Sequence, residues 1–187
     1  NNLRPISLVV LTPLILLGAL TLPSVSSEIV APGKYPNLQA ALDSAKSGDI
    51  VFLQPGRYRE QLTIPAGVTL RSQGDAEGGE IGMARAEVTV IDGSGKMPVI
   101  TLLEGSTLDG LAITGAGKFN QAEFDRHHKE RGENLADGQG AVGAKGNHPA
   151  LSISGVTAII RNCIVHGNGV PGIGIIGPGK AVIENNF

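Results

Sequence analysis

TAIIRNCIVHGNG (157–169) is the middle one of three segments that carry the same pattern of apolar residues and turn residues. STLDGLAITGAG (106–117) precedes it, and KAVIENNF (180–187) follows it in the same phase. Self-similarity of this kind is the signature of a repeat protein, in which each unit buries its apolar side chains against the next. The equivalent inward positions are Leu108, Ile160 and Ile183, then Leu111, Cys163 and Asn186, then Ile113 and Val165.

The spacing of these units shows one interruption. The step from Leu108 to Ile160 is more than twice as long as the step from Ile160 to Ile183, which leaves room for an inserted loop at 118–148. Each unit also follows another short apolar segment, and these segments are VITL (99–102), ALSI (150–153) and GIGI (172–175). Two or three short strands per step, separated by glycine turns, favour a solenoid whose coils stack on one another.

The residues before these units predict one short helix followed by further strands. Leu38, Ala41, Leu42 and Ala45 lie on one helical face, with Asn37 placed to cap the start and Gly48 to end the helix. IVFL (50–53), LTI (62–64) and VTL (68–70) are expected to be strands, separated by turns at QPGRY and PAG. With 3% aromatic residues, no Trp and 27 Gly, the core must consist of aliphatic side chains and tight turns.

GRYRE (56–60), which follows SGDIVFLQP, resembles the opening of pectinesterases and of many β-helix repeat proteins. Together with the repeats, it makes residues 35–187 similar to the pectin-lyase-like superfamily. The resemblance implies an all-β fold: a right-handed single-stranded parallel β-helix (solenoid) with a short N-terminal capping helix at 37–47. Such a helix would shield the open edge of the first coil.

The N-terminal segment predicts export. Residues 1–27 contain Arg4, an apolar run and then small residues, which is typical of a signal peptide; a membrane anchor is the alternative, but the run is only marginally long and contains Pro13. The mature domain is therefore expected at 28–187, in a secreted, periplasmic or cell-surface protein with no membrane contact after cleavage. The absence of an initial Met and the apolar pattern at the C-terminus predict a longer protein, truncated here at its C-terminus.

Charge and cysteine content narrow the class of protein further. Cleavage before Glu28 leaves 14 basic and 17 acidic residues, a net charge of −3, which argues against nucleic acid as the partner. The single Cys163 excludes an internal disulfide. Its place on an inward column indicates a buried packing residue.

One charged column stands next to the inward positions. Asp109, Arg161 and Glu184 each follow an inward residue, so they are expected to point outward, one above another, about 4.8 Å apart. The simpler interpretation is a surface ladder of ion pairs, which contributes about 0–1 kcal/mol per pair. The alternative is a polysaccharide site, because arginine binds the carboxylate of a uronate in two-point fashion.

The insertion at 118–148 carries five basic residues, five acidic residues and three histidines. Loops this long in a compact domain often serve function, and the family resemblance implies that such a loop forms a wall of the substrate groove. His127 and His128 are therefore candidate substrate-binding residues. A metal or acid–base site with Asp125 and Glu130 is an alternative, as is a short solvated helix; we expect no metal.

The resemblance implies polysaccharide as the partner but does not define the reaction. Pectinesterase activity is not expected, because NGVPGIGI (168–175) lacks the glutamine and carboxylate that this family has there. We expect a secreted protein that interacts with polysaccharide, as a polysaccharide lyase, glycoside hydrolase or epimerase. The alternative is a non-catalytic surface or periplasmic scaffold, so the sequence leaves open whether the chain is an enzyme. No cofactor is expected, with calcium required only for a lyase; the catalytic residues and the oligomeric state stay unassigned.

Overall fold

The computed structural model describes residues 26–118, 121–122, 125, 129 and 148–187 of the chain. In this part the protein is predominantly β, with few helices, and every strand pairing is parallel. The strands form three parallel sheets, which we call sheets A, B and C. The prediction of an all-β parallel fold is therefore confirmed at this level, and the arrangement is compatible with a parallel β-helix.

Sheet A has six strands in the order β1-β2-β5-β8-β11-β14, and sheets B and C have four strands each. The strands of sheet A are β1 (Glu28–Ala31), β2 (Ile50–Leu53), β5 (Thr69–Ser72), β8 (Ser106–Asp109), β11 (Thr157–Arg161) and β14 (Lys180–Glu184). Sheet B contains β3 (Gly56–Tyr58), β6 (Thr89–Asp92), β9 (Ala112–Thr114) and β12 (Ile164–Val165). Sheet C contains β4 (Leu62–Ile64), β7 (Ile100–Leu102), β10 (Leu151–Ser154) and β13 (Ile173–Ile176).

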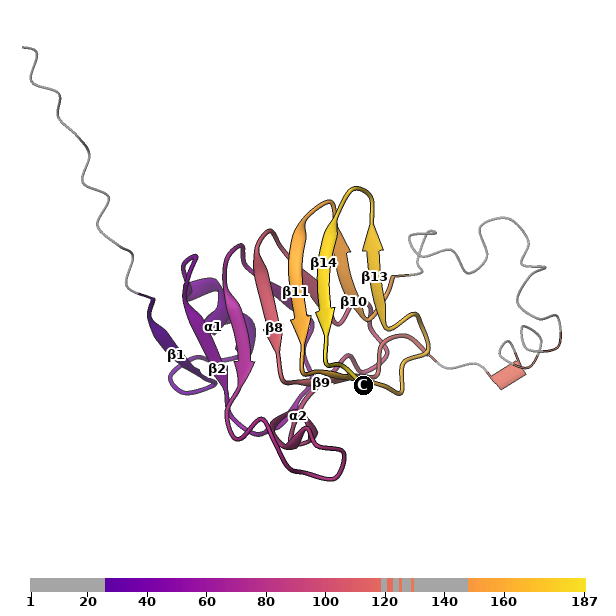
Figure 1. Ribbon diagram of the computed structural model, residues 1–187, viewed down its shortest axis with the longest axis horizontal. Helices are drawn as coiled ribbons and strands as arrows, with labels where there is room; N and C mark the ends of the chain where they lie inside the picture. Colours follow the sequence, from indigo (N-terminus) through magenta and orange to yellow (C-terminus); the bar gives the residue numbers. More distant parts are fainter. Residues whose placement is uncertain (1–25, 119–120, 123–124, 126–128, 130–147) are drawn as a thin grey trace, which may run out of the picture.

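The chain passes through sheets A, B and C in the same order on every circuit from β2 onward. Strands that are adjacent in a sheet therefore come from successive circuits, and β8, β11 and β14 lie side by side in Figure 1. The predicted steps are confirmed, because Ile160 pairs with Leu108 across the long step and with Ile183 across the short one.

The core is built from aliphatic columns that cross the sheets. In sheet A the column Val51, Leu70, Leu108 and Ile160 is in register from strand to strand, and each side chain is at most 1% exposed. Burying a side chain of this size stabilises the fold by about 1.5–3 kcal/mol. Ile183 continues the column but is 45% exposed, because β14 has a neighbour on one side only.

The helix α1 (Leu38–Ser44) begins where the sequence predicts. The Asn37 side chain accepts a hydrogen bond of 2.8 Å from the backbone N–H of Ala40, as an N-cap residue does. The Glu60 carboxylate accepts a second one, of 3.1 Å, from the backbone N–H of Leu38. The last residue of GRYRE thus ties this phrase to the start of α1.

The helix ends at Ser44, earlier than the predicted end beside Gly48. The backbone N–H of Lys46 donates to the Asp49 carboxylate at 2.8 Å, which commits this segment to a turn instead of a further helical turn. The helix packs against β1 and β4. Its buried side chains, which join the main core, are Leu38, Ala41 and Leu42.

Two features of the structure differ from the sequence-based expectations. The predicted turn at QPGRY contains β3, which pairs with β6. Residues 73–88 form an insertion between β5 and β6 that the repeats did not reveal, and it includes the short helix α2 (Ala84–Glu87). In Figure 1 this insertion lies at the carboxyl ends of the sheet A strands, next to the predicted charged column.

Candidate functional site

The predicted column of charged residues is present in sheet A. Asp109 pairs with Arg161, and Arg161 pairs with Glu184 on the next strand. The column also extends in the other direction, because Arg71 on β5 pairs with Asp109 and Phe52 on β2 pairs with Arg71. The outer face of sheet A therefore carries Phe52, Arg71, Asp109, Arg161 and Glu184 in one line.

Asp109 lies on the outer face of sheet A in register with Arg161, as expected, but its side chain is not open to solvent. Its side chain is only 2% exposed, because the insertion at 73–88 folds over it and brings Arg85 of α2 against it. The Arg85 guanidinium forms an ion pair with the Asp109 carboxylate and donates a further hydrogen bond of 2.8 Å to the Asp109 backbone carbonyl. Arg85 is itself 3% exposed, so both partners are buried.

Asp109 receives two further arginines and an amide. Arg161 lies 3.2 Å and Arg71 lies 3.7 Å from the carboxylate, and the Asn162 amide donates a hydrogen bond of 2.8 Å to it. Burial opposes ionisation of Asp109, but the hydrogen bonds from Asn162 and Arg85 and the charges of Arg85 and Arg161 outweigh it. The net result is a lowered pKa for Asp109, so it is ionised at neutral pH.

One carboxylate thus neutralises only one of three guanidinium groups. The side chains of Arg71 and Arg161 are 40% and 41% exposed, so the excess positive charge faces solvent on both sides of Asp109. Their backbones are two strands apart, but both side chains converge on the same oxygen of Asp109, Oδ2, so the two guanidinium groups form one cationic patch. The cluster can therefore hold an anionic group on the outer face of sheet A.

A groove of about 480 Å³ runs beside this cluster. Its apolar part is formed by Val30, which is 42% exposed, and by half-buried Phe52. Arg71 forms its cationic part, Glu28 adds one acidic group, and the start of the 73–88 insertion closes one side. An apolar surface next to a guanidinium group suits a ring that carries a carboxylate.

Asparagines in left-handed turns hold the end of the column. Asn162 and Asn185 follow Arg161 and Glu184 with φ of 56° and 50°, a region in which Asn is one of the few tolerated residues. The Asn185 amide donates to the Asn162 side-chain oxygen at 2.7 Å, while the Asn162 amide donates to Asp109. This chain of amides fixes the orientation of the buried carboxylate.

The remaining predicted site residues are not part of this cluster in the structure. Glu184 does not contact Asp109: it is exposed on β14 at the edge of sheet A, beside Arg161 in register, where its charge partly offsets that of Arg161. His127 and His128 lie outside the described residues, so their assignment to substrate binding stays a prediction.

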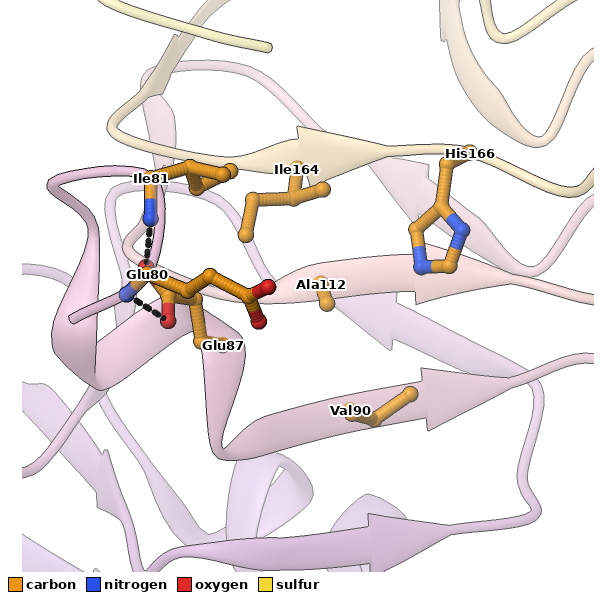
Figure 2. A pocket seen from close by; sticks show the side chains of 7 residues that line it. All are labelled: Glu80, Ile81, Glu87, Val90, Ala112, Ile164 and His166. Carbon is orange, nitrogen blue, oxygen red and sulfur yellow. Dashed lines mark hydrogen bonds between the residues drawn. The ribbon is translucent and has the colours of Figure 1, made fainter.

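A second pocket, of about 250 Å³, lies on the outer face of sheet B (Figure 2). We call it the sheet B pocket. Its floor consists of Val90, Ala112 and Ile164, which are in register on three neighbouring strands. The rest of its lining consists of Glu80, Ile81, Glu87 and His166.

Sequence reasoning missed Arg71, Arg85 and Phe52. A signal existed for Phe52, because it stands between Val51 and Leu53, and in a strand with these two inward the residue between them faces outward. Arg71 is equally predictable once β5 is aligned with β8. No local pattern predicts Arg85, because it reaches Asp109 from an insertion outside the repeat.

Other kinds of site find little support. Within the described part of the chain, no group of three or more His, Cys, Asp or Glu residues is arranged to hold a metal ion. The acidic cluster that calcium requires is therefore not found there, and the three guanidinium groups around Asp109 repel cations. Burial raises the pKa of the Cys163 thiol to about 11, so it is not a reactive nucleophile.

The same described residues contain no helix with the length and apolar character needed to span a membrane. Comparison with protein-family models, with curated proteins and with solved structures found no match to this chain.

Proposed function

We propose that this chain is a secreted right-handed parallel β-helix protein of the pectin-lyase-like type that binds an acidic polysaccharide along the outer face of sheet A. The observation that carries the proposal is the excess of arginine around Asp109. The order of the strands in three parallel sheets is compatible with this fold. The family resemblance carried by the repeats and GRYRE (56–60) implies the handedness, and the signal-peptide pattern of residues 1–27 implies the secreted location.

The ligand class follows from the charge and shape of the site. Guanidinium groups bind carboxylates in two-point fashion, and Arg71 and Arg161 each have an exposed side that Asp109 does not occupy. Because both arginines converge on one oxygen of Asp109, they form a single cationic patch that suits one uronate carboxylate, and the groove beside Arg71 leaves room for the neighbouring sugar of a chain. The apolar groove at Phe52 gives the sugar ring a surface on which to pack.

The state of Asp109 favours binding over catalysis at this position. Its carboxylate is buried and is contacted by three arginines and Asn162, so it is not available to a substrate as an acid, base or nucleophile. This supports the non-catalytic alternative, a surface or periplasmic carbohydrate-binding scaffold. The catalytic alternatives are a lyase, hydrolase or epimerase whose reacting groups lie elsewhere, with His127 and His128 as candidates for substrate contact.

The binding proposal is tested with polygalacturonate and alginate against the neutral polymer dextran, by isothermal titration calorimetry at low and moderate salt. Arg71→Gln/Arg161→Gln should reduce the affinity for the acidic polymers by about 10-fold or more, since each lost contact contributes about 1 kcal/mol. The salt dependence of binding should decrease in parallel. Dextran should not bind.

Arg57→Gln/Arg59→Gln is the matched control, because Arg57 and Arg59 are exposed arginines that lie outside the sheet A column. It removes the same two charges without changing the site, so the affinity should stay close to that of the unmodified protein. Equal losses in the control and in Arg71→Gln/Arg161→Gln would show nonspecific attraction and overturn the proposal.

Product analysis distinguishes the catalytic alternatives. Incubation with the same polymers is followed by ultraviolet absorbance for unsaturated products and by a reducing-end assay. Absorbing products indicate β-elimination, new reducing ends without absorbance indicate hydrolysis, and binding with neither product supports the scaffold.

A further inference from the structure

The sheet B pocket belongs to a different surface from the arginine cluster. Its floor is the outer face of sheet B, formed by Val90, Ala112 and Ile164. These residues form a second small apolar cluster with Ala86, separate from the main core. One side of this cluster is covered by α2, and the other side is the open pocket.

The pocket has a wall that is held in place before any ligand arrives. The Glu87 carboxylate accepts backbone hydrogen bonds from Glu80 at 2.7 Å, from Ile81 at 2.9 Å and from Met83 at 3.2 Å. The first two of these bonds are the main reason that the pKa of Glu87 is lowered. Glu87 is therefore a structural anion that fixes the segment carrying Glu80 and Ile81.

The charge of the pocket is negative. Glu80 and Glu87 both line it, and His166 at the opposite end is the third titratable lining residue (Figure 2). The Glu87 carboxylate is committed to the backbone, whereas Figure 2 shows the Glu80 side chain extending over the apolar floor. Ile81, which is 45% exposed, adds an apolar rim. The lining thus combines a free carboxylate with an aliphatic surface.

We propose that the sheet B pocket binds a small organic cation with an aliphatic body, of the primary alkylammonium type. The aliphatic part packs on Val90, Ala112 and Ile164, and the ammonium group pairs with the Glu80 carboxylate. His166 closes the far end of the pocket. The competing explanation is that the apolar cluster only attaches the 73–88 insertion to sheet B, in which case the pocket has no preference for charge.

The test uses n-butylammonium chloride as the probe and n-butanol as its uncharged counterpart, at constant ionic strength. Binding is followed by NMR through the methyl signals of Val90, Ala112 and Ile164 and the amide signal of Ile81. We expect saturable shifts with n-butylammonium and an affinity for n-butanol that is lower by about 5-fold, since one half-exposed charge pair contributes about 1 kcal/mol.

Glu80→Gln should lower the affinity for n-butylammonium by a similar factor, about 5-fold, while leaving the n-butanol affinity unchanged. Glu77→Gln is the matched control, because Glu77 is an exposed acid in the same insertion that does not line the pocket. Its affinity should equal that of the unmodified protein. Equal binding of the two probes, no effect of Glu80→Gln, or the same loss with Glu77→Gln would each overturn the proposal. Calcium chloride producing the same shifts at lower concentration would replace it with a metal site.

Discussion

Asp109 and Asp92 are both the last residues of strands, and both bind arginine side chains, yet their surroundings are opposite. At the end of β6, Asp92 pairs with Arg57 at 2.8 Å, and the Arg57 side chain is 54% exposed. At the end of β8, Asp109 pairs with Arg85, which is 3% exposed. The first pair keeps its cation in water, whereas the second pair has withdrawn both charges from water.

The difference shows how an insertion changes a repeat position. Asp92 also accepts a backbone hydrogen bond of 2.8 Å from Ser94 in its own turn, and its partner Arg57 belongs to the neighbouring strand β3 of the repeat. Asp109 depends on Arg85 from the 73–88 insertion. The Asp109 carboxylate carries one negative charge, which balances the charge of Arg85 alone. The half-exposed Arg71 and Arg161 are left with excess charge, which is what makes sheet A the better candidate for binding an anionic chain.

The largest expected effect tests the burial of the Asp109 pair directly. Asp109→Asn leaves the Arg85 guanidinium buried without a counter-charge, so we expect the free energy of unfolding to fall by about 3–5 kcal/mol. Asp92→Asn leaves exposed Arg57 in water, and the loss should be at most about 1 kcal/mol. Urea denaturation at pH 7 measures both values. Similar losses at the two positions would contradict the contrast between them.

The sequence predicted the position of Asp109 in sheet A but not its burial. The short and the long step between the repeats place Asp109, Arg161 and Glu184 in one column, because parallel pairing preserves register along successive circuits. Burial of Asp109 could not be predicted, since it depends on Arg85. The α2 segment is four residues long, and Met83 at its N-cap makes no side-chain capping bond, so it carries no helix signal.

The fold was likewise predictable where the repeat sets the pattern and not where tertiary contacts decide it. Strands within the repeats were predictable because inward columns impose apolar residues at fixed intervals. The strand β3 was not, because Gly56 and the turn residues around it favour a turn locally, while pairing with β6 makes Gly56–Tyr58 a strand. Tertiary pairing therefore overrides local propensity there.

A smaller effect is expected from pH, and its direction follows from the lowered pKa of Asp109. A carboxyl group whose pKa is lower in the folded state stabilises the fold above its ordinary value of 3.8, and this stability is lost as the pH falls through the folded-state pKa. The contribution of Asp109 should thus be constant from about pH 5 to neutral pH and be lost as the pH falls below 3.8. Asp92, Asp49 and Glu87 also have lowered pKa values and contribute in the same direction.

The variants Asp109→Asn and Asp92→Asn separate these contributions. Each variant should lose part of the decrease in stability at acidic pH, because the substituted group no longer takes up a proton there. Urea denaturation between pH 2 and 7, at constant ionic strength, gives the profiles. If the profile of Asp109→Asn keeps the full acid-dependent decrease of the unmodified protein, the ionised state of Asp109 is not what stabilises the fold.

The smallest effect concerns Asn162. It follows Arg161 in a left-handed turn, and its side-chain amide donates a hydrogen bond to Asp109. Asn162→Gly preserves the left-handed backbone with φ of 56° but removes the hydrogen bond to Asp109 and the exposed one from Asn185, so we expect a loss of about 1–2 kcal/mol in the free energy of unfolding. Asn162→Ala removes the same bonds and keeps the β-carbon without the polar side chain that lets Asn tolerate the left-handed region, so the loss should be about 1 kcal/mol larger. At the Asp92 turn Ser94 has φ of 51°, but its contact with the carboxylate is through the backbone N–H. Ser94→Gly should therefore retain that contact and leave stability equal or slightly higher.

Urea denaturation gives the free energy of unfolding of the three variants. A loss at Ser94→Gly equal to that at Asn162→Gly would mean that backbone conformation, and not the amide bond to the buried carboxylate, distinguishes the two turns.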